Sequence, residues 1–142
     1  MSEAAEYNDT VWAHFRAPRN TGEFPAGTPG VLKGRGGVRR HGREVEFQLR
    51  VTSDSRIVEC RYRVYGCPAT IALCSLMSET LKSRALAEAA AFSVVALADE
   101  LGLSAEKRAA AITVEDAIRA AVAEYNRPQR PPTAAGIEAQ QA

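Results

Sequence analysis

Apolar and polar positions alternate along two neighbouring stretches of the chain, and this alternation predicts a pair of β-strands. In residues 44–51 every second side chain is apolar, which is typical of a strand with one buried face. The apolar face consists of Val45, Phe47, Leu49 and Val51. Residues 56–65 alternate in the same way, and Ser53-Asp54-Ser55 between the stretches is typical of a turn. The pattern therefore predicts an antiparallel β-hairpin.

On both sides of the hairpin, apolar residues recur at the spacing of an amphipathic helix. Before it, Tyr7–Arg16 has this spacing and Pro18 is expected to end the helix. After it, a helix is predicted over Pro68–Arg84. The remaining predicted segments are a short helix or turn at Ser83–Ala91 and helices at Val94–Leu101, Ser104–Ala111 and Val114–Tyr125. Ser93 and Thr113 are expected to act as N-caps.

Glycine and proline mark the segments that are not expected to form regular structure. Arg19–Gly37 is rich in both, so a loop is predicted there. We expect one domain over residues 1–126, with a frayed start at Met1–Glu6, followed by a disordered tail at Arg127–Ala142. The order of helix, hairpin and several helices predicts an α+β fold. Its small antiparallel sheet has about three strands, with helices packed on one face.

Composition narrows the class of protein without identifying it. The chain has 142 residues, of which 46% are hydrophobic and 25% are charged, as in ordinary globular domains. The net charge of +1 gives no global electrostatic argument for binding nucleic acid or a membrane. Without a long apolar run or a secretory signal pattern, we expect a cytoplasmic protein. The 3 cysteines form an odd set, so reduced thiols are expected.

Candidate chemistry is concentrated where the second strand meets the following helix. Gly66 can turn freely and Pro68 suits the first helical position, which places Cys67 at or near the N-cap. Backbone N–H groups and the helix dipole then favour a thiolate, the form that accepts sulfur and binds metal. The local pattern leaves a second interpretation open, in which Cys67 is a small buried residue at a tight turn.

The other polar candidates have simpler interpretations. Cys60 falls on the apolar strand face and Cys74 on the buried side of the helix, so both are expected in the core, and His14 is expected to pack at the edge of the first helix. A basic run precedes the hairpin: Lys33, Arg35, Arg39, Arg40 and Arg43. It is either a solvated loop or a cationic flap over an anionic group or a thiolate.

Three motifs connect the chain to a known family. They are Pro18-Arg19-Asn20-x-Gly22, Tyr65-Gly66-Cys67 and Glu115-Asp116-Ala117-Ile118. With them, the segment from about Tyr7 to Tyr125 resembles the iron–sulfur cluster scaffold proteins of the IscU, SufU and NifU N-terminal type. The resemblance implies an α+β fold, a cysteine desulfurase as partner, and assembly of a [2Fe–2S] cluster on three cysteines and an aspartate.

The chain departs from that family at most of the implied ligands. His41 stands in place of the first cysteine, Arg43 in place of the aspartate, and Ala109 and Ala110 in place of a histidine and the third cysteine. The chaperone-recognition segment of the family reads Leu103-Ser104-Ala105-Glu106-Lys107 here, without its two prolines. Cys67 and His41 remain as candidate metal ligands. Two ligands do not hold a cluster or a structural zinc, so we predict no firmly bound iron, [2Fe–2S] cluster or zinc in the monomer.

A single working cysteine is similar to the arrangement in SufE-type sulfur acceptors. Cys67 would take a persulfide from the desulfurase, and Arg39, Arg40 and Arg43 would stabilise its anionic sulfur. Two alternatives stay open: a degenerate scaffold that binds and regulates the desulfurase without chemistry, and an iron or [2Fe–2S] carrier that completes its ligands with a partner. Each describes a scaffold or acceptor working with a desulfurase and other iron–sulfur assembly proteins, rather than a stand-alone enzyme.

Overall fold

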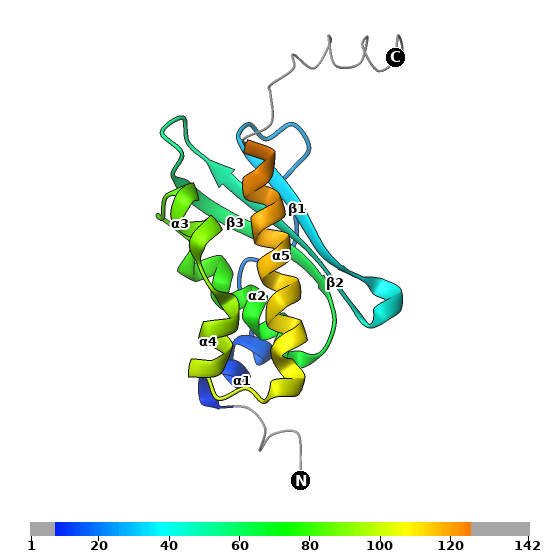
Figure 1. The fold of residues 1–142 in the computed structure, drawn as a ribbon. Coiled ribbons are helices and arrows are strands. Elements are labelled where there is room, and N and C mark those ends of the chain that lie inside the picture. The colour runs from blue at the N-terminus through cyan, green and yellow to red at the C-terminus, as the bar shows by residue number, and fades with distance from the viewer. Residues whose placement is uncertain (1–7, 126–142) are drawn as a thin grey trace.

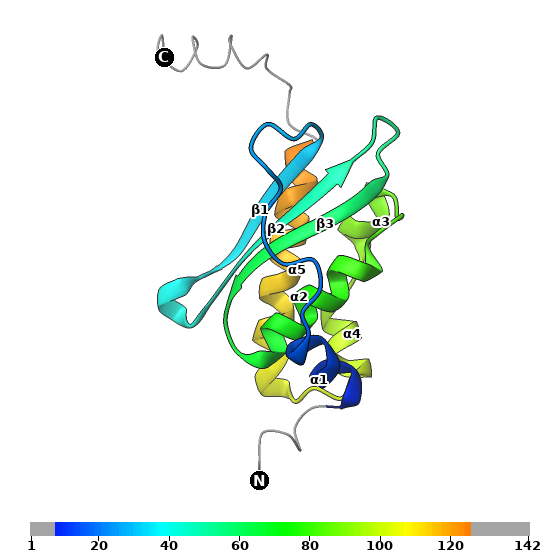
Figure 2. The ribbon, with the colours of Figure 1, turned by 180° about the vertical axis from the view of Figure 1, so that it is seen from behind.

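A three-stranded antiparallel sheet carries the helices on one face in the computed structural model, which describes residues 8–125 (Figures 1 and 2). The strands are β1 (Val31–Val38), β2 (Arg43–Val51) and β3 (Ile57–Tyr65), in the order β1-β2-β3. The helices are α1 (Asp9–Arg16), α2 (Pro68–Thr80), α3 (Leu86–Ala91), α4 (Val94–Glu100) and α5 (Arg108–Tyr125). Two short 3-10 turns are η2 (Arg39–His41) and η3 (Ala105–Lys107). The predicted α+β class is confirmed.

The central hairpin forms as the alternating pattern predicts. β2 and β3 pair antiparallel, with Glu44 opposite Tyr65 and Leu49 opposite Cys60. Val45, Phe47 and Leu49 are fully buried on the face toward the helices. Helix α2 packs on β3 and α5 on β1 and β2, while α1, α3 and α4 pack on these two helices. The sheet and the pair α2–α5 therefore form the core that positions everything else.

Strand β1 corrects the sequence prediction, which placed a loop over Arg19–Gly37. Val31–Val38 pairs with β2 along its whole length. Its glycines are needed for packing: a Cβ on Gly34 would lie 2.1 Å from the backbone nitrogen of Ala121, and one on Gly36 would lie 2.2 Å from the carbonyl oxygen of Thr113. Glycine at these positions lets α5 approach the sheet closely. A glycine-rich composition looks the same in such a strand and in a loop, so the sequence alone did not separate the two.

Helix boundaries differ from the predictions in several places. Instead of two helices at Ser104–Ala111 and Val114–Tyr125, the chain forms the turn η3 and one helix, α5. Thr113 is not an N-cap, because α5 begins at Arg108, and the Thr113 hydroxyl donates to the carbonyl oxygen of Ala109 within the helix at 2.8 Å. The helix predicted over Pro68–Arg84 ends at Thr80. Ser93 does cap α4, since its hydroxyl accepts from the backbone N–H of Ala96 at 3.0 Å. The segments Met1–Glu6 and Arg127–Ala142, expected to lack fixed structure, lie outside the described residues.

The segment after α1 crosses the outer face of the sheet, opposite the helices. Gly22 donates its N–H to the carbonyl oxygen of Tyr62, on the edge of β3 that faces away from β2, at 2.9 Å. Phe24 donates its N–H to the side-chain oxygen of Gln48 at 3.0 Å. Gln48 lies on the polar face of its strand, yet it is fully buried because this segment covers it. The sheet is therefore solvated on only part of its outer face.

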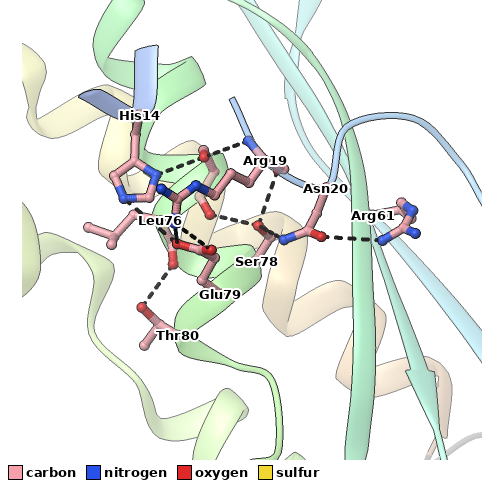
Figure 3. A network of polar contacts seen from close by, with 9 residues as sticks. His14, Arg19, Asn20, Arg61, Leu76, Ser78, Glu79 and Thr80 are labelled. Atoms are coloured by element: carbon pink, nitrogen blue, oxygen red, sulfur yellow. Dashed lines mark hydrogen bonds and ion pairs between the residues drawn. The ribbon is translucent and has the colours of Figure 1, made fainter. Parts of the chain in front are cut away.

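A polar network fastens α1 and the following residues to α2 (Figure 3). The hydroxyl of Ser75 lies 2.8 Å from Nδ1 of His14 and accepts from the backbone N–H of Arg19 at 2.9 Å. The Arg19 guanidinium donates to both carboxylate oxygens of Glu79. Burial lowers the pKa of His14, and the opposing charge of Glu79 only partly offsets this. His14 is thus a packing residue at the edge of the core, as the sequence indicated.

The contact between Gly34 and α5 gives the first prediction. Gly34→Ala is expected to lower the free energy of unfolding by about 1–3 kcal/mol, because the new methyl group overlaps backbone atoms that cannot rotate away. Urea denaturation followed by circular dichroism measures the change. Lys33→Ala, at the exposed neighbouring position, is the matched control. Equal unfolding midpoints for the two variants would contradict the close packing of α5 on β1.

Candidate functional site

Cys67 occupies the joint between β3 and α2, as the sequence predicted. It is the N-cap of α2, with φ −76° and ψ 169°, and Pro68 is the first helical residue. In Figures 1 and 2 the chain leaves the sheet after β3 and curves in beneath the helices before α2 begins. The side chain of Cys67 is partly exposed and lies against the edge of the hydrophobic core. The thiol is therefore held by a rigid element yet open to solvent.

Thr70, one turn into α2, is the closest polar partner of the Cys67 thiol. Its hydroxyl oxygen lies 3.4 Å from the sulfur, and Thr70 itself is fully buried. A Cβ on Gly66 would lie 3.0 Å from the Thr70 side chain, so glycine leaves the space that Thr70 fills. In α2 and α5, the hydroxyls of Thr80 and Thr113 bond a carbonyl oxygen four residues earlier. At Thr70 the hydroxyl faces the thiol instead.

The surroundings of Cys67 favour its thiolate. Burial raises the pKa of the thiol, but the opposing influences are together stronger, and the net shift is downward. These are the Thr70 hydroxyl, the backbone N–H groups of Thr70 and Ala69, and the positive charge of Lys107. The sulfur makes no side-chain capping hydrogen bond that meets the usual geometric criteria. A thiol with a lowered pKa is the more reactive one at neutral pH.

The other two cysteines lie in the core, as expected from their positions. Burial raises the pKa of Cys60 to about 12, and it also raises the pKa of Cys74. Cys60 is 1% exposed and Cys74 is 0% exposed. A buried thiol in apolar surroundings is inert. The three free cysteines thus divide into one candidate nucleophile and two packing residues.

The basic residues of the hairpin lie at and beside the β1–β2 turn. Arg39 lies over the ring of Tyr65, with 4.4 Å from its Cζ to the ring centroid, and also pairs with Glu44 at 3.6 Å. Arg40 and His41 are exposed in η2. Arg43 is partly buried, and its Nε has no hydrogen-bond partner in the described part of the chain. Support of the Cys67 thiolate by Arg39, Arg40 and Arg43 stays a prediction, since Lys107 is the cation acting on its pKa here.

The donor set does not fit a metal ion or cluster within residues 8–125. No three side chains of His, Cys, Asp or Glu come together there. Ala110 is buried at the start of α5 and Ala109 beside it is exposed, so neither family position offers a ligand. Cys67 and His41 remain as candidate ligands from two different turns of the chain. Every helix within the described range is also too short or too polar to cross a membrane.

Two residues of this site escaped the sequence analysis. Thr70 stands three residues after the N-cap, the spacing of a capping box, so its hydroxyl could have been expected near the Cys67 side chain. Lys107 comes from η3, forty residues along the chain, and only the packing of the last helices brings its charge toward the thiol. The position of Thr70 near Cys67 could therefore be predicted from local sequence spacing, whereas the position of Lys107 depends on the tertiary structure.

Comparison with known proteins connects this geometry to a family. The model of the NifU-like N terminal domain matches residues 6–131. The iron–sulfur cluster assembly scaffold protein IscU of Escherichia coli K12 is 36% identical over 119 residues, which is 84% of this chain and 93% of that protein. Iron-sulfur cluster assembly protein 2 of Arabidopsis thaliana is 33% identical over 132 residues, covering 93% of this chain and 81% of the relative. The chain belongs to the NifU-like N-terminal domain family.

Solved structures share the fold at low sequence identity. A putative iron–sulfur cluster assembly scaffold protein for the SUF system from Fervidobacterium islandicum AW-1 superposes with a TM-score of 0.65 at 12% identity, over 85% of this chain and 99% of that one. A NifU-like N-terminal protein from Brucella abortus superposes with a TM-score of 0.54 at 18% identity, over 85% of this chain and 80% of that one. These structures confirm the expected fold, and the family match and the IscU relative confirm the resemblance inferred from the three sequence motifs.

The contact between Thr70 and Cys67 gives the second prediction. Thr70→Val removes the hydroxyl while keeping the shape, so the pKa of Cys67 is expected to rise and its alkylation at pH 7 to slow. The rate of iodoacetamide modification of Cys67 against pH measures this. Thr80→Val is the control, because its hydroxyl bonds Leu76 within the same helix. An unchanged pH profile for Thr70→Val would show that the hydroxyl does not act on the sulfur.

Proposed function

We propose that this protein acts in iron–sulfur cluster biogenesis by accepting sulfur from a cysteine desulfurase as a persulfide on Cys67. The observation that carries the proposal is the contrast among its three thiols. Cys67 is partly exposed with a lowered pKa, while Cys60 and Cys74 are buried with raised pKa values. The relatives named for iron–sulfur cluster assembly, one of them as a scaffold protein, support the choice of pathway. A cytoplasmic location is part of the same proposal.

The transfer is a thiol–disulfide exchange at sulfane sulfur. The Cys67 thiolate attacks the terminal sulfur of the desulfurase persulfide, R–S–SH, and a new S–S bond forms as the old one breaks. The electron pair of the broken bond leaves with the desulfurase cysteine, R–S⁻, and Cys67 becomes Cys67–S–SH. Atoms and charge balance without an added oxidant or reductant. The protein needs one accessible thiolate for this step and no metal ligand.

Thr70 and Lys107 have defined parts in this step. The Thr70 hydroxyl can donate to the Cys67 sulfur while it is anionic, and the Lys107 charge lowers the free energy of the same anion. Thr70 comes from α2, which is part of the core, and Lys107 comes from η3, which directly precedes α5. We propose that they keep Cys67 ionised before attack and stabilise the persulfide anion afterwards.

A conventional scaffold role would require the chain to hold iron and sulfide as its cargo, and the donor set argues against this in the monomer. We predict that anaerobic reconstitution with iron and sulfide, and separately with zinc, leaves far less than one metal ion per chain after desalting. Metal analysis and the visible absorption spectrum measure it. Near-stoichiometric metal that is lost in Cys67→Ala and in His41→Ala would contradict the prediction and restore the scaffold role.

Persulfide loading tests the proposal directly. After incubation with a cysteine desulfurase and cysteine, intact mass spectrometry is expected to find one added sulfur, and peptide mapping is expected to assign it to Cys67. Cys67→Ser should carry none, whereas Cys60→Ser, if it folds, should load as the wild type does. No added sulfur under conditions that load a known acceptor would overturn the proposal.

Binding distinguishes the acceptor from a regulator that does no chemistry. Cys67→Ser keeps the shape of the turn, so a purely regulatory protein would bind the desulfurase and alter its turnover without ever carrying sulfur. The acceptor proposal expects binding in both forms and sulfur only on the wild type. Surface plasmon resonance together with the mass assay separates the two functions.

A further inference from the structure

Strand β1 forms one edge of the sheet, and its ladder with β2 determines which of its backbone N–H and C=O groups point outward. Val31 lies opposite Arg50, and Val51 donates its N–H to the carbonyl oxygen of Gly30 at 2.8 Å. Gly30 and Val51 are therefore a hydrogen-bonded pair of the antiparallel ladder. Because such pairs alternate with non-bonded ones, the N–H and C=O groups of Lys33 and Arg35 point away from β2.

These outward groups have no partner among the described residues. The hydrogen bonds of residues 8–125 include none to the backbone of Lys33 or Arg35 beyond the β1–β2 ladder. The opposite edge of the sheet differs, because β3 is bonded there by Thr21 and Gly22 near Tyr62 and by Ser83 and Arg84 at Ile57. In both views β1 borders the sheet on its open side (Figures 1 and 2). Among residues 8–125, therefore, one sheet edge is capped and the other is able to accept a strand.

The open edge is strongly basic. Between residues 33 and 43 there are five basic side chains besides His41 and no acidic one, namely Lys33, Arg35, Arg39, Arg40 and Arg43. Lys33, Arg35, Arg39 and Arg40 are exposed. Within residues 8–125, Lys33 and Arg40 make no ion pair, Arg35 reaches Glu44 and Glu46 only at 4.0 and 3.5 Å, and Arg39 pairs with Glu44 at 3.6 Å. A second copy pairing through the same edge would bring like charges together.

A groove on the outer face continues this surface toward the joint at Cys67. Its lining residues are Arg35, Arg39, Glu44, Glu46, Arg63, Val64 and Tyr65. Arg35 thus belongs both to the open edge and to the groove. Tyr65 is 46% exposed, so it offers an aromatic surface beside the arginines, two residues before Cys67. A strand laid on β1 would have its outer-face side chains beside this groove.

We propose that the edge of β1 is a docking site for an acidic extended segment of a partner protein, which adds a fourth strand to the sheet. Backbone hydrogen bonds to Lys33 and Arg35 supply the pairing, and carboxylates on the incoming strand meet the basic side chains of the edge and the β1–β2 turn. The proposal does not depend on sulfur transfer at Cys67, and it can fail or succeed separately from that function.

Peptide binding by the full chain tests the proposal. The probe is a fluorescein-labelled peptide of alternating glutamate and valine, and the controls are the same peptide with a central proline and its lysine counterpart. We expect anisotropy to report binding of the acidic peptide alone. Hydrogen exchange by NMR should show slowed exchange at the amides of Lys33 and Arg35 when the peptide is bound.

A pair of variants separates backbone pairing from charge. Arg35→Ala removes the guanidinium, and Arg35→Pro also removes the outward N–H without breaking a bond to β2. Affinity is expected to be about fivefold weaker for Arg35→Pro than for Arg35→Ala, the effect of one lost hydrogen bond. If circular dichroism finds Arg35→Pro unfolded, Lys33→Pro against Lys33→Ala makes the same comparison.

Several results would overturn the proposal. They are no binding of the acidic peptide, equal binding of the proline-containing peptide, and equal affinity in the alanine and proline variants. Slow exchange of the Lys33 and Arg35 amides in the free monomer would mean that the chain itself covers the edge. A dimer at working concentration by sedimentation, lost in Arg35→Pro, would assign the edge to a second copy and equally overturn the proposal.

Discussion

The packing of Thr70 against Gly66 fixes the thiol of Cys67 where strand β3 gives way to helix α2. Any side chain at Gly66 would press on Thr70, which is fully buried, so glycine is needed where the strand passes this close to the first turn of the helix. Cys67 is then held as the N-cap, with the first amides of α2 and one hydroxyl near its sulfur. The chemistry of the site depends on this joint more than on any charged residue.

The rest of the fold holds the joint in place from both sides. Helix α5 approaches β1 so closely that Gly34 and Gly36 cannot carry side chains, which holds the middle of α5 against the sheet, and η3 directly precedes this helix. Lys107 at the end of η3 is thereby brought toward the thiol. On the other side, the network around Ser75 ties α1 and Arg19 to the middle of α2 (Figure 3). The position of Cys67 is thus a property of the whole domain.

Elements with a strong period or a local cap were predictable from the sequence. The hairpin followed from strict alternation, and the capping of α4 by Ser93 followed from residue type and place. Strand β1 was missed because its glycines resemble those of a loop, although they serve contact with α5. Thr113 was misassigned because a threonine inside a helix can bond its own backbone, as it does to Ala109. Lys107 could not be placed near Cys67 without the tertiary fold.

The central claim is that one thiol of three is set apart by its surroundings, and competitive alkylation of the native protein tests it most directly. A short pulse of labelled iodoacetamide at pH 7, followed by peptide mapping, reports the modified fraction of each cysteine. The account predicts rapid labelling of Cys67, with Cys60 and Cys74 labelled only after the protein is unfolded in urea. Comparable labelling of all three thiols in the folded protein, or slow labelling of Cys67, would contradict it.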